Sequence, residues 1–137
     1  MKRTLRWLDV AVYLVLLALA AWFGPHGAAV WYVGLCLSLA AAPLWLAAKW
    51  QLGEAFSVRP EARRLVTGGL YSKLRHPIYV FGTVAFLGAV LAMLGWSALV
   101  VWVVVALVQF RRVGREDRVL AQAFGPEYAA YRDATWF

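Results

Sequence analysis

Arginine, histidine and tyrosine side chains meet at the start of one apolar stretch of the sequence. The motif there reads Arg75-His76-Pro77-Ile78-Tyr79. Proline suits the first turn of a helix, where its missing N–H is not needed, so a helix is predicted to begin at Pro77 with His76 at its cap. The positive end of the helix dipole then lies beside His76. The pattern therefore gathers a guanidinium, an imidazole and a phenol where polar and apolar sequence meet.

A second group that could do chemistry is the carboxylate pair Glu116 and Asp117. Helical periodicity places Glu116 on an apolar face, together with Val113, Leu120 and Phe124. A carboxylate on an apolar face near a membrane is costly unless a cationic or hydrogen-bonding group meets it. Arg112 or Arg115 of the same helix could do so. In the other interpretation, a bound ligand compensates the Glu116 carboxylate.

The composition indicates that these groups are positioned by membrane helices. The 137-residue chain is 64% hydrophobic and only 15% charged, whereas soluble domains carry about 25% charged residues. We expect one all-α integral membrane domain over residues 1–137. The net charge of +7 does not indicate nucleic-acid binding, because the basic residues punctuate apolar runs rather than forming a patch.

Two charge-free runs define the expected transmembrane helices. Residues 10–48 are interrupted by Gly24-Pro25-His26-Gly27, and residues 77–110 have one plausible break, at Gly95. Four spans are predicted, at residues 7–23, 28–50, 77–94 and 96–110. The last two form a helical hairpin, with one long tilted helix as the alternative. Residues 51–76 form a loop, and residues 111–137 form a short C-terminal helix and tail.

The distribution of basic residues predicts the topology. All 14 Lys and Arg residues lie in the N-terminal tail, the central segment or the C-terminal segment, and the two predicted turns between spans have none. Because basic residues favour the cytoplasmic side, both termini and the loop 51–76 are expected in the cytoplasm. The small size and the Ala- and Arg-rich composition point to a bacterial inner (plasma) membrane. With only two His and one Cys, no metal site is expected.

Four motifs in order resemble a family of membrane methyltransferases, which includes isoprenylcysteine carboxyl methyltransferases and phospholipid N-methyltransferases. The resemblance covers residues 53–131. Its motifs here are Leu65-Val66-Thr67-Gly68-Gly69-Leu70-Tyr71, Arg75-His76-Pro77-Ile78-Tyr79, Glu116-Asp117-Arg118-Val119-Leu120 and Phe124-Gly125-Pro126-Glu127-Tyr128-Ala129-Ala130-Tyr131. The chain departs from the family at Asp117, where a second Glu is usual, and in its short C-terminus.

The resemblance implies methyl transfer from S-adenosylmethionine to a lipophilic acceptor, a lipid or an isoprenoid-like molecule, at the cytoplasmic face. It implies Arg75 and His76 as catalytic residues. It also implies a cofactor site made by Gly69, Tyr71, His76, Tyr79, Glu116 and Asp117, in which Glu116 and Asp117 take the ammonium or ribose hydroxyls. Arg75 would then meet the carboxylate of the cofactor, and Tyr128 and Tyr131 would serve mainly for interfacial packing.

Two other functions stay open at this point. Sterol reductases, which bind a nicotinamide cofactor, carry a similar segment of the R-H-x-N-Y type, but here Pro77 and Ile78 differ from that pattern. A non-enzymatic membrane protein with the same fold is the third reading. The sequence does not identify the acceptor, and Gly82, Gly88 and Gly95 could pack either between two copies of the chain, as a homodimer, or within one.

Overall fold

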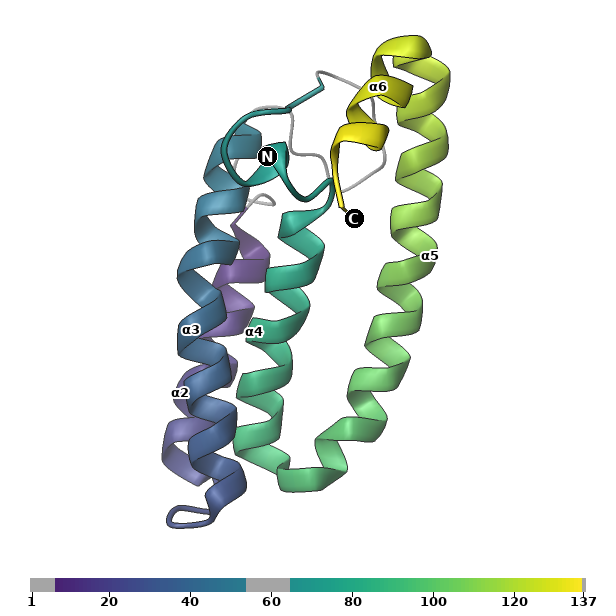
Figure 1. Cartoon of the computed structure of the whole chain (residues 1–137). Helices are drawn as coiled ribbons and strands as arrows, with labels where there is room; N and C mark the ends of the chain where they lie inside the picture. Colours follow the sequence, from purple (N-terminus) through teal and green to yellow (C-terminus); the bar gives the residue numbers. More distant parts are fainter. Residues whose placement is uncertain (1–6, 54–64, 137) are drawn as a thin grey trace.

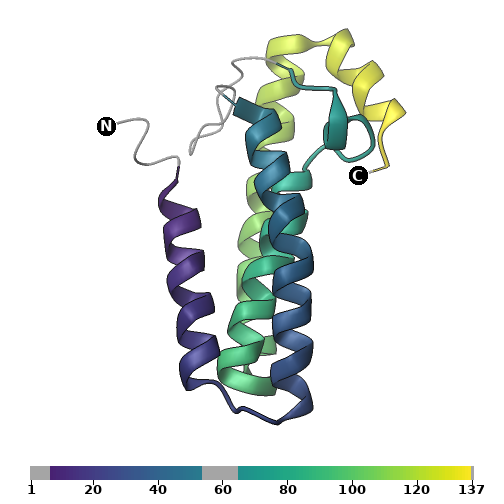
Figure 2. The same cartoon turned by 90° about the vertical axis from the view of Figure 1, so that its left-hand side faces the viewer.

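The computed structural model describes residues 7–53 and 65–136, and these residues form helices and connecting turns without a strand. Residues 54–64 of the predicted loop 51–76 and residues 1–6 of the N-terminal tail lie outside this range. The elements in chain order are α2 (Leu8–Phe23), α3 (Ala29–Leu52), η2 (Gly69–Ser72), α4 (Pro77–Leu94), η3 (Gly95–Ser97), α5 (Ala98–Phe124) and α6 (Pro126–Ala134) (Figure 1). Figures 1 and 2 both place η2 and α6 at one end of the bundle, opposite the η3 turn.

Helices α3 and α4 pack closely because small residues line their interface. A side chain added at Gly34 would bring its Cβ within 2.5 Å of the Ala92 backbone nitrogen, and one added at Gly88 would collide with the backbone of Ser38. Such small residues let two helix backbones approach each other. Gly82 faces the Trp45 indole in the same interface. Gly82 and Gly88 therefore pack within one chain rather than between two copies.

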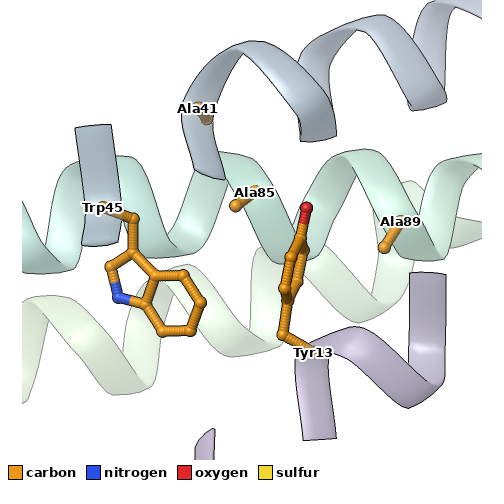
Figure 3. Close-up of a cluster of buried hydrophobic side chains, with 5 residues drawn as sticks. All are labelled: Tyr13, Ala41, Trp45, Ala85 and Ala89. Atoms are coloured by element: carbon orange, nitrogen blue, oxygen red, sulfur yellow. The ribbon is translucent and has the colours of Figure 1, made fainter. Parts of the chain in front are cut away.

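Helix α2 joins this pair through an aromatic and polar contact. The Tyr13 ring packs against the rings of Trp45 and Phe86, each 5.5 Å away between centroids. Its hydroxyl lies 2.8 Å from Ser38 Oγ, which donates to the Ala85 carbonyl oxygen at 2.9 Å. Figure 3 shows Tyr13 and Trp45 on either side of Ala85. The buried hydroxyls are thus hydrogen-bonded, as an apolar environment requires.

Helix α5 folds back along α4 after the η3 turn, so residues 77–110 form a hairpin rather than one straight helix (Figure 1). Gly95 makes this turn with φ +63°, a conformation that favours glycine. Unlike α3, α5 packs loosely. Among the residues of α5, only Ala98 is buried.

The C-terminal segment differs from the prediction. A separate short helix was expected within residues 111–137, but α5 continues without a break from Ala98 to Phe124. The reason is that its polar end, residues 111–124, contains strong helix formers and no proline to interrupt the ladder. The new helix begins only at Pro126, after Gly125 reverses the chain with φ +49°.

The apolar helices expose much of their surface, as helices in lipid do. Two helical stretches are long and apolar enough to cross a membrane, Ala29–Leu52 and Pro77–Phe124, the second of which contains the η3 turn. Only 22% and 17% of their most apolar windows are buried in the protein, whereas the core helix of a soluble protein would be mostly buried. The shorter α2, with 16 residues, would span about 24 Å. Membrane crossing by four helices and the cytoplasmic position of both termini stay predictions.

Candidate active site

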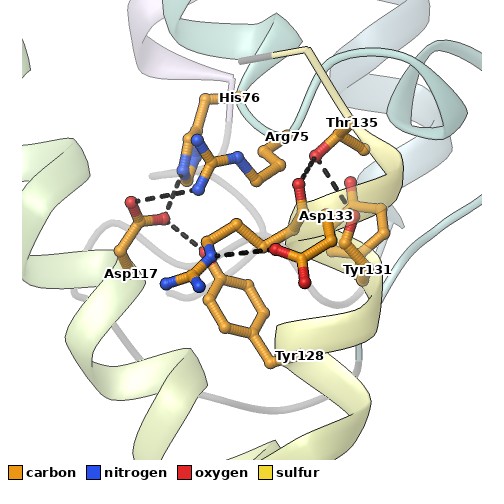
Figure 4. Close-up of polar contacts among 8 residues, drawn as sticks. Arg75, His76, Asp117, Tyr128, Tyr131, Asp133 and Thr135 are labelled. Carbon is orange, nitrogen blue, oxygen red and sulfur yellow. Dashed lines mark hydrogen bonds and ion pairs between the residues drawn. The ribbon is translucent and has the colours of Figure 1, made fainter.

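Three side chains from two segments, Arg75 and His76 before α4 and Tyr128 in α6, converge on the carboxylate of Asp117 at the end of the bundle that carries η2 and α6 (Figure 4). His76 Nε2 lies 2.7 Å from Oδ1 of Asp117, and the Tyr128 hydroxyl donates to the same oxygen. Arg75 Nη1 lies 3.6 Å from Oδ2. Asp117 on α5 thus connects the start of α4 with α6.

The local sequence explains this convergence. His76 is the residue before α4, and Pro77 occupies the first position of the helix, as predicted from the motif. Gly125 turns the chain between α5 and α6, which brings Tyr128 back beside the helix it follows. The His76 side chain is only 4% exposed, so its ring is fixed by packing as well as by Asp117.

The electrostatics favour an ionised Asp117. Partial burial acts to raise the pKa of Asp117, but the hydrogen bonds from Tyr128 and His76 and the charges of His76 and Arg75 outweigh it and lower the pKa below its ordinary value. Burial, followed by the hydrogen bond and charge of Asp117, raises the pKa of Tyr128. An ionised carboxylate only accepts hydrogen bonds, so both Tyr128 and His76 Nε2 must donate to it.

A second polar group surrounds Tyr71 in η2. Burial and the nearby charge of Glu116 raise the pKa of the Tyr71 hydroxyl. Glu116 also lies beside the hydroxyl of Tyr79 in α4. The His76 and Tyr79 rings, with centroids 5.9 Å apart, connect this group to the Asp117 cluster.

Helix α6 and the residues after it close over η2. The Tyr131 hydroxyl donates to the Tyr71 carbonyl oxygen at 2.7 Å, and the Trp136 N–H donates to the Lys73 carbonyl oxygen at 2.9 Å. Burial raises the pKa of Tyr131 to about 12, although the charge of Arg75 acts to lower it. Tyr131 therefore stays a donor at neutral pH.

Two buried polar atoms in this region have no hydrogen-bond partner among the described residues, the Tyr71 hydroxyl and Arg75 Nε. Buried polar groups are nearly always paired, so these two atoms call for a partner from outside the described residues, such as water, an ion or a ligand. Both belong to residues that the sequence motifs singled out.

Residues 22–127 match the phospholipid methyltransferase family. The chain belongs to this family. The match confirms the resemblance found in the motifs, and it identifies the protein as a membrane methyltransferase that acts on lipid. The matched stretch runs from the end of α2 into the start of α6. No curated protein and no solved structure matches the chain.

Most of the predicted site residues of this methyltransferase lie together. Arg75, His76 and Asp117 form one group, and Tyr71, Tyr79 and Glu116 form the adjoining one. Gly69 stands apart, because it faces the Gln51 side chain of α3, whose Oε1 accepts a hydrogen bond from the Leu70 N–H at 2.8 Å. Among the described residues, no three His, Cys, Asp or Glu side chains are grouped as a metal ion would require.

Sequence reasoning undervalued the two tyrosines of α6. It assigned Tyr128 and Tyr131 mainly to packing, but their hydroxyls hold Asp117 and the η2 backbone. Their spacing of three residues, which puts them on one helix face, was the available signal. Sequence reasoning also missed the ion pair between Lys49 and Asp9. Here the signal was the position of these opposite charges at the two ends of the first charge-free run.

Proposed function

We propose that this methyltransferase transfers a methyl group from S-adenosylmethionine to a lipophilic acceptor at the cytoplasmic face of the membrane. The observation that carries the proposal is the pair of buried, unpaired atoms, Tyr71 Oη and Arg75 Nε, inside the segment that matches the family. S-adenosylmethionine supplies a methyl group on an electrophilic sulfonium. Its polar end carries a carboxylate and an ammonium, and the residues of the site offer a partner for each.

Each residue of the site has a role in this proposal. The Arg75 guanidinium binds the carboxylate of the cofactor, for which its unpaired Nε is available. Glu116 binds the ammonium or the ribose hydroxyls. Tyr71 lies near the sulfonium, where an aromatic ring favours a cation, and Tyr79 packs against the adenosine with His76. Asp117 is already occupied by three partners, so we assign it a positioning role instead of a direct cofactor contact.

His76 has a further role in proton transfer. Nε2 donates to the ionised Asp117, so in the neutral form of the ring Nδ1 is the nitrogen that can accept a proton. If the group that receives the methyl carries a proton, this group must lose the proton before or during methyl transfer. Nδ1 of His76 could take that proton. Most of the remaining rate acceleration would come from holding the two reactants in line.

The acceptor enters from the bilayer between α4 and α5. The support for this route is the loose packing of α5, whose apolar residues such as Val100 and Val104 are exposed. A hydrocarbon chain can lie against that surface without crossing a polar barrier. The bacterial inner membrane and the cytoplasmic position of both termini, taken from the positive-inside pattern, complete the proposal.

The test is transfer of a labelled methyl group from S-adenosylmethionine into a bacterial lipid extract, with the purified protein reconstituted in vesicles of that extract. We expect labelled lipid with the wild type and a loss of roughly 100-fold with His76→Ala. The exposed Tyr32→Phe variant is the control. A parallel assay with NADPH tests the reductase. Lipid reduction without methyl transfer would overturn the proposal, as would a folded protein that shows neither activity.

A further inference from the structure

The polar end of α5, residues 111–124, carries a stripe of three arginines, which are Arg111, Arg115 and Arg118. All three residues are exposed. At about 3.6 residues per turn, these positions lie within about 60° of one another around the helix axis. The arginine stripe therefore forms one continuous face, which rises over about 10 Å along α5.

The arginine stripe lies on the side of α5 away from the candidate active site. Glu116 and Asp117 are the only acidic residues of α5, and each lies roughly 100° or more around the helix axis from every arginine of the stripe. Tyr128 of α6 donates to Asp117, so α6 covers a different side of α5. Figure 1 likewise shows α6 on the side of α5 that faces the other helices. The stripe is thus on the outer surface of the bundle.

The three guanidinium groups of the stripe have no ion pair or hydrogen bond within the part of the chain that the structure describes. Other arginines at this end of the bundle differ. Arg75 Nη1 and Arg132 Nε each lie 3.6 Å from an aspartate oxygen, and the Arg112 guanidinium lies over the Tyr79 ring. Like charges at the spacing of the stripe destabilise a helix. An anion from outside the described residues would offset this repulsion.

The same face of α5 is apolar before the stripe begins. Val100, Val104 and Leu107 continue the spacing of the stripe toward the η3 turn, and their exposed fractions are 73%, 59% and 59%. A face that changes from exposed aliphatic to exposed basic residues matches the boundary between hydrocarbon and headgroups in a bilayer. The rise of the stripe, about 10 Å, is enough to cross a headgroup layer, which is roughly 5–8 Å deep on each side of the hydrocarbon core.

We propose that this outer face of α5 binds an anionic membrane phospholipid, with its phosphate at the arginine stripe and its hydrocarbon against Val100, Val104 and Leu107. Arginine suits this ligand because its planar guanidinium donates two parallel N–H groups to phosphate oxygens. A headgroup that also carries an ammonium is disfavoured, because no carboxylate of α5 shares the face of the stripe. The inference goes beyond the proposed function, since this lipid lies away from the active site and is not the methyl acceptor.

The experiment is native mass spectrometry of the purified protein in detergent, with equal amounts of phosphatidylglycerol and phosphatidylcholine of the same chain length. We expect the wild type to retain phosphatidylglycerol with a preference of roughly tenfold or more, because each basic residue near a membrane surface favours anionic lipid. In Arg111→Gln/Arg115→Gln the preference should fall to less than roughly twofold. Glutamine forms helices about as well as arginine, so these exposed exchanges should leave the fold intact.

The matched control also removes two positive charges, from exposed residues at the same end of the bundle, as Lys73→Gln/Arg132→Gln, and should keep the preference. Equal retention of the two lipids by the wild type, or a preference that survives Arg111→Gln/Arg115→Gln, would overturn the inference. An equal loss of preference in the control would overturn it as well, because net charge rather than the stripe would then attract the lipid.

Calorimetric binding of S-adenosylmethionine separates this inference from the proposed function. Cofactor binding should be the same in the wild type and in Arg111→Gln/Arg115→Gln, because the stripe lies away from the active site. A loss of cofactor binding in this variant alone would overturn the position assigned to the lipid. A wild type that prefers phosphatidylglycerol but does not bind the cofactor would support the lipid site and overturn the proposed function.

One further arm identifies the source of the anion. Soluble glycerol phosphate, which carries the phosphate without hydrocarbon, is added at the same concentration as the lipids. Retention of phosphatidylglycerol would support a membrane lipid as the ligand, because the hydrocarbon then contributes to binding. Displacement of phosphatidylglycerol would overturn the lipid part of the proposal.

Discussion

Helix α4 packs against α3 and against α5 in opposite ways. Toward α3 it presents glycine and alanine, and the two backbones approach until no side chain fits at Gly34 or Gly88. Toward α5 it presents Tyr79, whose ring lies against the Arg112 guanidinium, and a cavity lined by residues of all four long helices adjoins this contact. One face of the same helix is a closed interface, whereas the other is open to a ligand.

The comparison shows how a small membrane enzyme can combine a rigid scaffold with access for a lipid. The α3–α4 interface fixes α4 and therefore the His76 side chain at its start. Helix α5 is joined to α4 mainly at its two ends, through the η3 turn and through Asp117, His76 and Tyr128. The middle of α5 is left free to line a binding site.

The largest effect is expected from filling the closed interface. Gly34→Leu would place its Cβ 2.5 Å from the Ala92 nitrogen, and the helices would have to separate. We expect the free energy of unfolding to fall by more than about 3 kcal/mol, the upper part of the range for overpacked cores. Thermal unfolding in detergent measures this. Gly114→Leu on α5, where nothing lies within 4 Å, is the control and should change little. Equal effects at both positions would remove the distinction between the interfaces.

A smaller effect is expected from breaking the polar end of the open interface. Asp117→Asn removes the negative charge that orients His76, and methyl transfer should fall roughly tenfold to 100-fold, as for other groups that orient a functional histidine. Asp117→Glu, the residue usual in the family, should keep most of the activity. The assay is labelled methyl transfer into lipid extract. Full activity of Asp117→Asn would mean that His76 does not depend on this carboxylate.

A third prediction concerns the attachment of α6. Tyr128→Phe deletes the hydroxyl that donates to Asp117, and a hydrogen bond to a charged group contributes about 1.5–3 kcal/mol. Hydrogen exchange in residues 126–134 should become faster while that of α3 is unchanged. The exposed Tyr32→Phe serves as the control. Unchanged protection in α6 would show that the helix is held by packing alone.

The smallest expected effect is that the contribution of Asp117 to stability decreases at acid pH. Because the pKa of Asp117 is lower in the folded protein than its ordinary value of 3.8, its contribution to stability is complete above that pH and is lost as the pH falls through the lower, folded pKa. The difference in melting temperature between wild type and Asp117→Asn should therefore shrink below about pH 3.8. A difference that stays constant with pH would show that the charge of Asp117 does not stabilise the fold.

The sequence predicted the parts of this molecule that depend on local patterns. Pro77 fixed the start of α4, Gly95 marked the turn before α5, and the motifs around His76 and Glu116 identified the family. The packing between helices could not be predicted in this way. The sequence around Gly88 is the same whether this glycine packs within one chain or between two chains, so the sequence alone does not distinguish the two cases. The pairing of Asp9 with Lys49 and the hydroxyl contacts of Tyr128 depend on how helices distant in sequence lie in space.

The most direct test of the account is calorimetric binding of S-adenosylmethionine to the purified protein in detergent, supplemented with lipid. We predict saturable binding in the wild type that weakens roughly tenfold to 100-fold in His76→Ala and in Glu116→Ala, because each removes a charged or hydrogen-bonding contact. Asp133→Ala, an exposed carboxylate on α6, should bind as the wild type does. A folded protein without saturable binding, or equal binding by all four proteins, would contradict the account.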